Sequence, residues 1–188
     1  MDASSREECL PGTQCDVLQL MFDWASKCPT EQNILWIHGL SGSGKSTLAT
    51  TFANRLRNYG QLGAFLFFDR NVAERSDPTA VVRTIACQLG MFHSQMGTAI
   101  CNVIENNPNI CSLPIDLQFD QLLVDPLCSV PGFGVKEPVI FVLDALDECG
   151  DPKERRRLLK ILAKKAHNLP FNVRIVITSS ADTDICCI

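Results

Sequence analysis

Apolar residues gather in four short runs along the chain, and polar or turn-forming residues bound each run. The runs are Ile34–Ile37, Ala64–Phe68, Val139–Leu143 and Val173–Ile177. None of them alternates cleanly between apolar and polar positions, which is typical of a strand that is covered on both faces. The pattern therefore predicts a buried and mostly parallel sheet.

Stretches with apolar residues three and four positions apart lie before and between these runs, and they predict helices. The predicted helices cover residues 15–27, 48–57, 78–89, 96–105, 116–128 and 151–166. We expect the fifth to be interrupted near Pro126, and the sixth to begin with a capping box formed by Asp151 and Glu154. Strands that alternate with helices predict an α/β fold, in which ligands bind beyond the carboxyl ends of the strands.

The composition is that of one globular domain. With 188 residues, of which 46% are hydrophobic, the chain is long enough to bury a sizeable core. A net charge of −4 gives no sign of nucleic-acid or membrane-surface binding. The basic run Arg155–Arg157 lies on the predicted helix 151–166, opposite its apolar stripe, and we interpret it as a solvated face. The polar, acidic residues 1–8 and the lack of a long apolar stretch predict neither a signal peptide nor a membrane span.

Ten cysteines raise the question of a disulfide framework. They are scattered along the chain, no C-x-x-C pair occurs, and Cys87, Cys101 and Cys128 fall inside predicted helices. We therefore interpret them as small apolar residues of a protein that works in the reducing cytoplasm. The three histidines form no cluster of metal ligands, and we expect His38 to be a strand-end residue.

The phosphate-binding pattern G-x-x-x-x-G-K-[ST] follows the first apolar run directly. A loop rich in Gly and Ser can point its backbone N–H groups at phosphate oxygens, and the helix behind it adds its positive N-terminal end. We expect Lys45 to reach the β- and γ-phosphates, and the Ser46 hydroxyl to bind Mg²⁺. The candidate nucleotide-binding residues are Gly39, Ser41, Gly42, Ser43, Gly44, Lys45, Ser46 and Thr47.

A carboxylate ends the third apolar run. Asp144 is expected to emerge at the same edge of the sheet as the phosphate-binding loop, where it can hold Mg²⁺ together with Ser46. The small side chain of Ala145 lets the backbone pass close to the phosphates. Asp147 and Glu148 are the candidate catalytic residues, and either can orient or deprotonate an attacking water. The alternative is that these two acids merely begin a helix.

Taken together, Gly39–Thr47 and Asp144–Glu148 resemble the NACHT class of STAND-type signal-transduction NTPases. In that class a small residue and two further acids follow the metal-binding aspartate. Other stretches look like fungal NACHT proteins, which are often joined to WD40 or other repeats: Cys9–Thr13, Phe67–Arg70, Gln118–Phe119, Val124–Leu127 and Val176–Ser179. The resemblance covers roughly residues 9–180. It implies a three-layer α/β/α P-loop NTPase that acts as a molecular switch and binds ATP or GTP with Mg²⁺.

The resemblance also implies a role for each site residue. Lys45 and Ser46 would bind the phosphates and Mg²⁺, and Asp144 would bind Mg²⁺. Asp147 or Glu148 would orient or deprotonate the attacking water. Such proteins usually carry an arginine after Thr178-Ser179 that senses the γ-phosphate, whereas this chain has Ser180. Because a hydroxyl cannot replace the cationic fork that arginine brings to phosphate, we expect slow hydrolysis at best.

We expect the chain to hold most, but not all, of a NACHT domain. Its parts would be a flexible N-terminus at 1–10, a flanking helix at 11–28 and the NTPase domain at 29–188. In the STAND arrangement a fifth strand pairs with the first, and residues 179–188 are too few for a helix and another strand. The fifth strand, effector or repeat domains, and self-assembly are therefore expected of a longer protein.

Two other functions stay open at this point. One is a nucleotide-binding scaffold without turnover, which Ser180 favours. The other is a P-loop kinase of a small metabolite, which would need a lid with clustered arginines, whereas residues 93–137 are apolar and contain no arginine. The expected partner is a nucleotide, with no nucleic acid and no membrane. No stretch of the chain distinguishes adenine from guanine.

Overall fold

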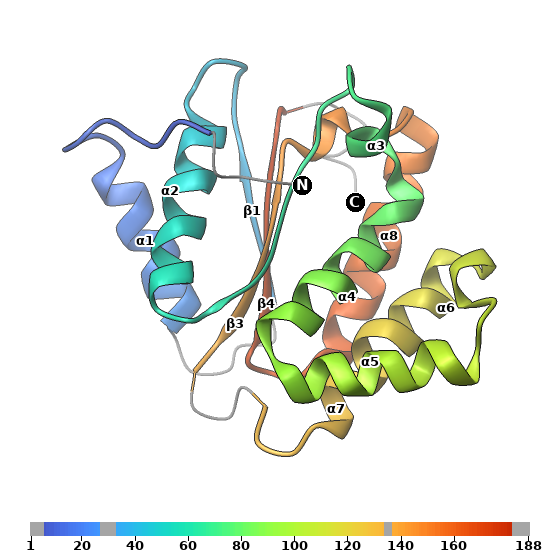
Figure 1. Cartoon of the computed structure of the whole chain (residues 1–188). Coiled ribbons are helices and arrows are strands. Elements are labelled where there is room, and N and C mark those ends of the chain that lie inside the picture. Colours follow the sequence, from blue (N-terminus) through green and yellow to red (C-terminus); the bar gives the residue numbers. More distant parts are fainter. Residues whose placement is uncertain (1–5, 27–32, 134–136, 182–188) are drawn as a thin grey trace.

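A four-stranded sheet runs through the computed structural model, which describes residues 6–26, 33–133 and 137–181 (Figure 1). The strands are β1 (Ile34–His38), β2 (Leu62–Phe67), β3 (Val139–Asp144) and β4 (Val173–Ser179). Their order across the sheet is β1-β4-β3-β2, and every pairing is parallel. The predicted α/β fold with a parallel sheet is confirmed.

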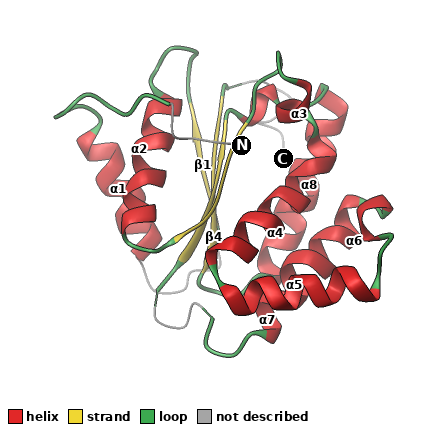
Figure 2. Ribbon diagram, viewed as in Figure 1, coloured by secondary structure: helices red, strands yellow, loops and turns green. Residues whose placement is uncertain are grey.

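Helices cover both faces of the sheet and complete three layers (Figure 2). One face carries α1 (Cys15–Ser26) and α2 (Lys45–Asn58). The other carries α3 (Ala73–Ser76), α4 (Val81–Phe92), α5 (Ser94–Asn106), α6 (Ile115–Phe119), α7 (Asp125–Ser129) and α8 (Pro152–Lys165). Short helical turns are η1 (Pro78–Ala80), η2 (Ile110–Ser112), η4 (Leu146–Glu148) and η5 (Ala166–Asn168). None of the helices in the described ranges is long and apolar enough to cross a bilayer.

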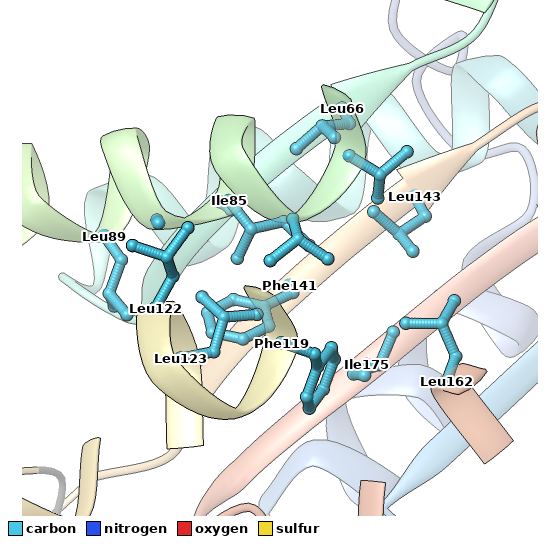
Figure 3. Packing of buried hydrophobic residues seen from close by; sticks show 14 of the residues in the cluster. Leu66, Ile85, Leu89, Phe119, Leu122, Leu123, Phe141, Leu143, Leu162 and Ile175 are labelled. Carbon is cyan, nitrogen blue, oxygen red and sulfur yellow. The ribbon is translucent and has the colours of Figure 1, made fainter. Parts of the chain in front are cut away.

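Successive residues of β2, β3 and β4 pack into two separate cores. Phe65, Ile140, Val142 and Val176 pack with α1 and α2. The residues between them face the larger core, which α4 to α8 complete; Figure 3 shows Leu66, Ile85, Leu89, Phe119, Leu122, Leu123, Phe141, Leu143, Leu162 and Ile175 in contact there. Because both faces are buried, these strands consist mostly of apolar residues, with the buried Arg174 as an exception within β4.

The first strand lies at an edge of the sheet. β1 pairs with β4 alone, and its residues Ile34–Ile37 are half-buried, whereas β3 and β4 are buried throughout. The prediction of full cover on both faces is therefore wrong for this strand. Within residues 6–26, 33–133 and 137–181 there is no fifth strand. The predicted end of the first helix at Lys27 and the tail from residue 182 lie outside the described residues.

The chain between Ile115 and Ser129 is helical throughout. The interruption expected near Pro126 is a change of helix type and not a break in the helix: α6 and α7 are separate α-helical segments, and Pro126 is the second residue of α7. Directly before it, Asp120–Val124 (η3) form a wider π-helical segment. The wider turn relieves the clash that a proline ring makes with the carbonyl group four residues earlier, here that of Leu122.

Gly63 lets β2 pack closely against the side chains of β3. A Cβ atom at this position would lie 2.6 Å from Val139 Cγ1 and 2.8 Å from Phe141 Cε1. We therefore expect Gly63→Ala to lower the free energy of unfolding by roughly 1–3 kcal/mol, measured by urea denaturation. Combining it with Val139→Ala makes room for the new methyl group, so the double variant should lose less than the sum of the two single variants. Additive losses would contradict the packing argument.

Candidate functional site

The loop between β1 and α2 ends at the N-terminus of α2. Gly42 and Gly44 have φ angles of +79° and +84°, in the region that side chains other than glycine adopt only under strain. Gly44 is the N-cap of α2, and no described side chain caps that helix. The N–H groups of its first turn are therefore directed at the space before the helix, which suits an anion.

Lys45 bends back over this loop. Its Nζ atom donates to the carbonyl oxygens of Gly39 at 2.8 Å and Leu40 at 2.7 Å. The Thr47 hydroxyl donates to the carbonyl oxygen of Gly44 at 2.8 Å, so it stabilises the first turn of α2. The ammonium group is thus held beside the N–H groups of the helix, and both can meet the same anion.

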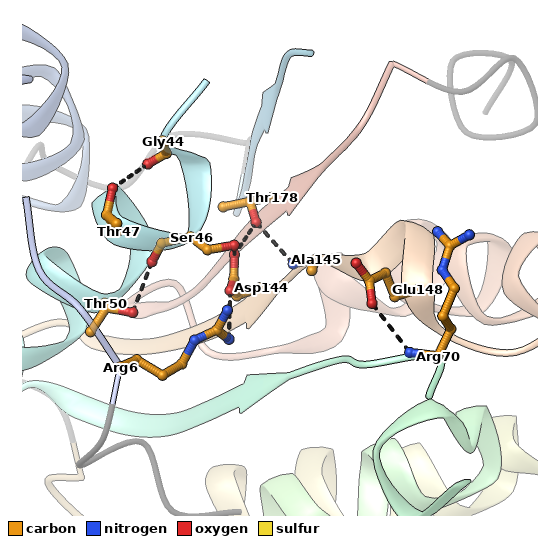
Figure 4. Close-up of polar contacts among 10 residues, drawn as sticks. All are labelled: Arg6, Gly44, Ser46, Thr47, Thr50, Arg70, Asp144, Ala145, Glu148 and Thr178. Carbon is orange, nitrogen blue, oxygen red and sulfur yellow. Dashed lines mark hydrogen bonds and ion pairs between the residues drawn. The ribbon is translucent and has the colours of Figure 1, made fainter. Parts of the chain in front are cut away.

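Asp144, the last residue of β3, is fully buried and joins side chains from three other segments (Figure 4). Its Oδ1 atom accepts hydrogen bonds from Ser46 Oγ at 3.1 Å and Thr178 Oγ1 at 2.6 Å. Its Oδ2 atom lies 2.9 Å from Arg6 Nη1 in an ion pair. Thr178 Oγ1 also accepts from the Ala145 amide at 3.0 Å, which ties the backbone after β3 to β4.

Ser46 and Asp144 fit a magnesium ion by their chemistry. A hydroxyl and a carboxylate supply the hard oxygen ligands that Mg²⁺ prefers, and the structure brings the two side chains together as predicted. The buried Oδ2 atom of Asp144 receives no hydrogen bond within the described chain. Its ion pair with Arg6 shows that this oxygen is balanced by a cation.

A cavity of about 340 Å³ lies between the loop and the turn that follows β3. It is lined by Ser41, Gly42, Gly44, Lys45, Ser46, Thr47, Ala145, Asp147, Glu148 and Ser180. Gly39 and Ser43 belong to the loop but not to this lining, and Asp144 is buried. The structure therefore brings the phosphate-binding pattern and both candidate catalytic carboxylates to one cavity.

Asp147 and Glu148 lie in the turn η4 and not in the first turn of α8, which begins with the Asp151 capping box as predicted. Ala145 precedes η4 with φ +58° and ψ +45°, a left-handed conformation that is strained for alanine. Glu148 Oε2 accepts from the Arg70 amide at 3.2 Å. These contacts fix the backbone of the turn and hold the Glu148 carboxylate beside the β2–α3 loop.

Arg155 stabilises the same turn through the carbonyl oxygens at its end. It is buried, and its Nη1 atom donates to the carbonyl oxygens of Asp147 at 2.6 Å and Cys149 at 3.4 Å. The prediction of a solvated arginine run is therefore wrong for Arg155, although Arg156 and Arg157 are exposed. Carbonyl oxygens at the end of a turn lack backbone donors, which explains why a buried guanidinium is stable here.

The cysteines do not form bridges in the described chain. Those that are free are Cys9, Cys15, Cys87, Cys101, Cys111, Cys128 and Cys149. Burial raises the pKa of Cys149 to about 12, so its thiol stays protonated and packs as an apolar group. Cys87, Cys101 and Cys128, which we interpret as small apolar residues, are free as well, and they lie on the exposed sides of their helices.

Two site residues were not identified from sequence. Thr178 fixes the Asp144 carboxylate, and a hydroxyl at the end of the neighbouring strand was a usable signal. Arg6 lies far in the sequence from the phosphate-binding and acidic motifs, and no spacing pointed to it. Ser180 was named, and the structure places it in the cavity lining with a buried Oγ atom that has no hydrogen-bond partner within the described ranges.

A larger groove of about 690 Å³ lies elsewhere, along α8. Its lining consists of Asp116, Lys153, Arg156, Arg157, Lys160, Ile161, Lys164 and Lys165. It contains no residue of the phosphate-binding or acidic motifs, and Lys165 pairs with Asp120 at 2.5 Å. Its lysines and arginines match the solvated face expected of this helix.

Comparisons with known proteins place this geometry in context. The sequence model of the family described as Nephrocystin 3, N-terminal, matches residues 17–180. No curated protein sequence matches the chain. Cdc6p from Pyrobaculum aerophilum is similar in structure, with a TM-score of 0.60 and 16% identity over 98% of this chain and 43% of that one. The Aeropyrum pernix Orc1 protein, solved in complex with DNA, has a TM-score of 0.52 and 19% identity over 93% of this chain and 40% of that one. The chain thus spans less than half of either protein, and these likenesses concern the fold alone.

Proposed function

The chain belongs to the Nephrocystin 3, N-terminal, family, and on that premise we propose that it binds a nucleoside triphosphate, ATP or GTP, together with Mg²⁺. The family match and the two structural likenesses fit a NACHT-like P-loop NTPase. We propose further that it is the switch module of a NACHT-type signalling protein and hydrolyses nucleotide slowly. Self-assembly and effector or repeat domains would belong to the full-length protein.

One observation carries the proposal: the cavity of about 340 Å³ joins the uncapped N-terminus of α2 and Lys45 to the acidic turn after β3. A triphosphate needs N–H groups and a cation on its phosphates, and oxygen ligands for its metal ion. The N–H groups of α2, Lys45 and Ser46 line the one cavity, and the buried Asp144 is bonded to Ser46. A structural turn rich in glycine would not require a buried carboxylate bonded to Ser46.

Each residue of the site has a proposed task. The loop N–H groups and Lys45 bind the phosphates, and Ser46 and Asp144 hold Mg²⁺, which when bound neutralises phosphate charge. Asp147 or Glu148 orients the attacking water or takes its proton. Thr178 and Ala145 keep the Asp144 carboxylate in place through the hydrogen bonds already described.

The competing functions are supported less well. Residues 94–129 form helices that pack on α4 and into the larger core, which does not resemble the arginine-lined lid that a small-molecule kinase needs. A scaffold that binds without turnover remains the second candidate, because the cavity holds Ser180 where related switches place an arginine. DNA is present in the Aeropyrum pernix structure, but this chain has a net charge of −4, and we propose no nucleic-acid partner for it.

Titration with fluorescent ATP and GTP analogues, with Mg²⁺ and with EDTA, tests the proposal. We expect micromolar binding, which corresponds to about 8 kcal/mol, and weaker binding in EDTA. Phosphate release should be slow and should not rise when small-molecule acceptors are added. No binding of either analogue would refute the proposal, binding without release would favour the scaffold, and acceptor-dependent release would favour the kinase.

A further inference from the structure

The N-terminal segment, residues 6–10, lies along α2 and was expected to be loosely attached as part of residues 1–10, of which 1–5 lie outside the described residues. The Cys9 amide donates to Thr51 Oγ1 at 2.8 Å. Glu8 Oε1 accepts from Asn54 Nδ2 at 2.6 Å. The segment is therefore attached to the helix that begins at the phosphate-binding loop, and only a short length of chain separates these contacts from Arg6.

Arg6 reaches from this segment into the candidate metal site (Figure 4). Its Nη1 atom lies 2.9 Å from Asp144 Oδ2, and its guanidinium carbon lies 4.4 Å from the centre of the Phe67 ring. The Arg6 side chain is 25% exposed, whereas the Asp144 side chain is 0% exposed. A cation from outside the sheet thus compensates a buried carboxylate, which would otherwise be costly to keep ionised.

The ion pair is of a kind that another cation can replace. Arg6 Nη1 and Asp144 Oδ2 are close, but neither has a hydrogen-bond partner within the described chain, so the contact lacks the alignment of a strong bidentate pair. Its strength is therefore mostly charge attraction. A divalent cation brought to Ser46 and Asp144 would compete for the same negative charge and would repel the guanidinium at short range.

We propose that Arg6 is the internal counter-ion of Asp144, which Mg²⁺ and nucleotide must displace, so that filling the site detaches residues 6–10 from α2. This inference rests on the proposed nucleotide function and adds regulation to that same site. The state of the metal site is thereby transmitted to the N-terminal segment. Without nucleotide the segment stays attached, and with Mg²⁺ and nucleotide it is released.

Removing the arginine should make metal binding easier. Because the wild-type chain must first break the pair, its apparent affinity for the Mg²⁺-nucleotide complex is the intrinsic affinity multiplied by the fraction of molecules in which Arg6 has left the site. We expect the ratio of Kd in EDTA to Kd in Mg²⁺, for a fluorescent non-hydrolysable triphosphate, to rise roughly five- to tenfold in Arg6→Gln.

Arg75→Gln is the matched control. The Arg75 guanidinium carbon also lies 4.4 Å from the centre of the Phe67 ring, yet no described contact joins it to Asp144. For Arg75→Gln, the ratio of Kd in EDTA to Kd in Mg²⁺ should equal that of the wild type. An unchanged ratio in Arg6→Gln, in a chain that still binds the triphosphate, would overturn the Arg6 inference and leave the proposed function standing. Failure of the wild type to bind any triphosphate would refute both.

Hydrogen–deuterium exchange of the wild-type chain tests the release without any substitution. The Cys9 amide, bonded to Thr51 Oγ1, should exchange slowly without ligand and with triphosphate in EDTA. With Mg²⁺ and the non-hydrolysable triphosphate, peptides covering residues 6–14 should exchange at least about tenfold faster, because the segment opens locally. Equal protection in all three conditions, measured where fluorescence shows that the nucleotide is bound, would overturn the inference.

Discussion

Lys45→Ala is expected to weaken triphosphate binding by at least about tenfold. The ammonium group is the cation that the structure holds beside the N–H groups of α2, and it already donates to two carbonyl oxygens of the loop. A hydrogen bond to a charged group contributes about 1.5–3 kcal/mol, and a tenfold loss corresponds to about 1.4 kcal/mol. Titration with a fluorescent nucleotide in Mg²⁺ measures the effect.

Leu40→Ala is a suitable control for that experiment. Leu40 lies in the same loop, its side chain is 81% exposed, and the substitution keeps the carbonyl oxygen that Lys45 contacts. We expect wild-type affinity from this variant, and unchanged circular dichroism from both. If Lys45→Ala binds the triphosphate as tightly as Leu40→Ala does, the assignment of the loop to phosphate binding is wrong.

Ser180→Arg is expected to raise single-turnover hydrolysis by about tenfold or more. Ser180 lines the cavity that holds Lys45 and Glu148, and its buried hydroxyl has no hydrogen-bond partner within the described chain. A guanidinium at this position can supply the cationic fork that phosphate charge favours. Arginine fingers of P-loop enzymes accelerate hydrolysis by roughly 10³–10⁵, which sets a ceiling for the effect.

Two further variants at Ser180 separate charge from size. Ser180→Met fills the cavity without charge and should leave the rate low, while Ser180→Lys adds a point charge and should give a smaller gain than arginine. In the Ser180→Arg background, Glu148→Gln and Asp147→Asn show which carboxylate orients or deprotonates the attacking water. Only the substitution that removes this carboxylate should reduce the rate of hydrolysis. If Ser180→Arg binds triphosphate normally and hydrolyses it no faster, our interpretation of this position is wrong.

Local pattern was sufficient wherever neighbours in sequence decide the structure. The four strands follow from short and mostly apolar runs, and the start of α8 follows from Asp151 and Glu154, whose capping box forms as expected. The meeting of Ser46 with Asp144 could also be predicted, because parallel strands bring their carboxyl ends to one edge. The prediction that both faces are covered failed at β1 and not at β2, although both are edge strands: α2 and α4 pack on β2, and which helices cover a strand does not follow from how apolar the strand is.

The sequence by itself therefore determined the α/β fold, the strands and most helices, and the grouping of the phosphate-binding loop with the acidic turn. Only the tertiary structure decided that Arg6 lies against Asp144, that Thr178 bonds the same carboxylate, and that Arg155 is buried beneath the turn at Asp147. The physical reason is that propensity and periodicity act over a few residues, whereas a buried charge is stabilised by whichever partner the folded chain brings within reach. For Asp144 that partner comes from the far end of the chain, and no pattern in the sequence connects the two.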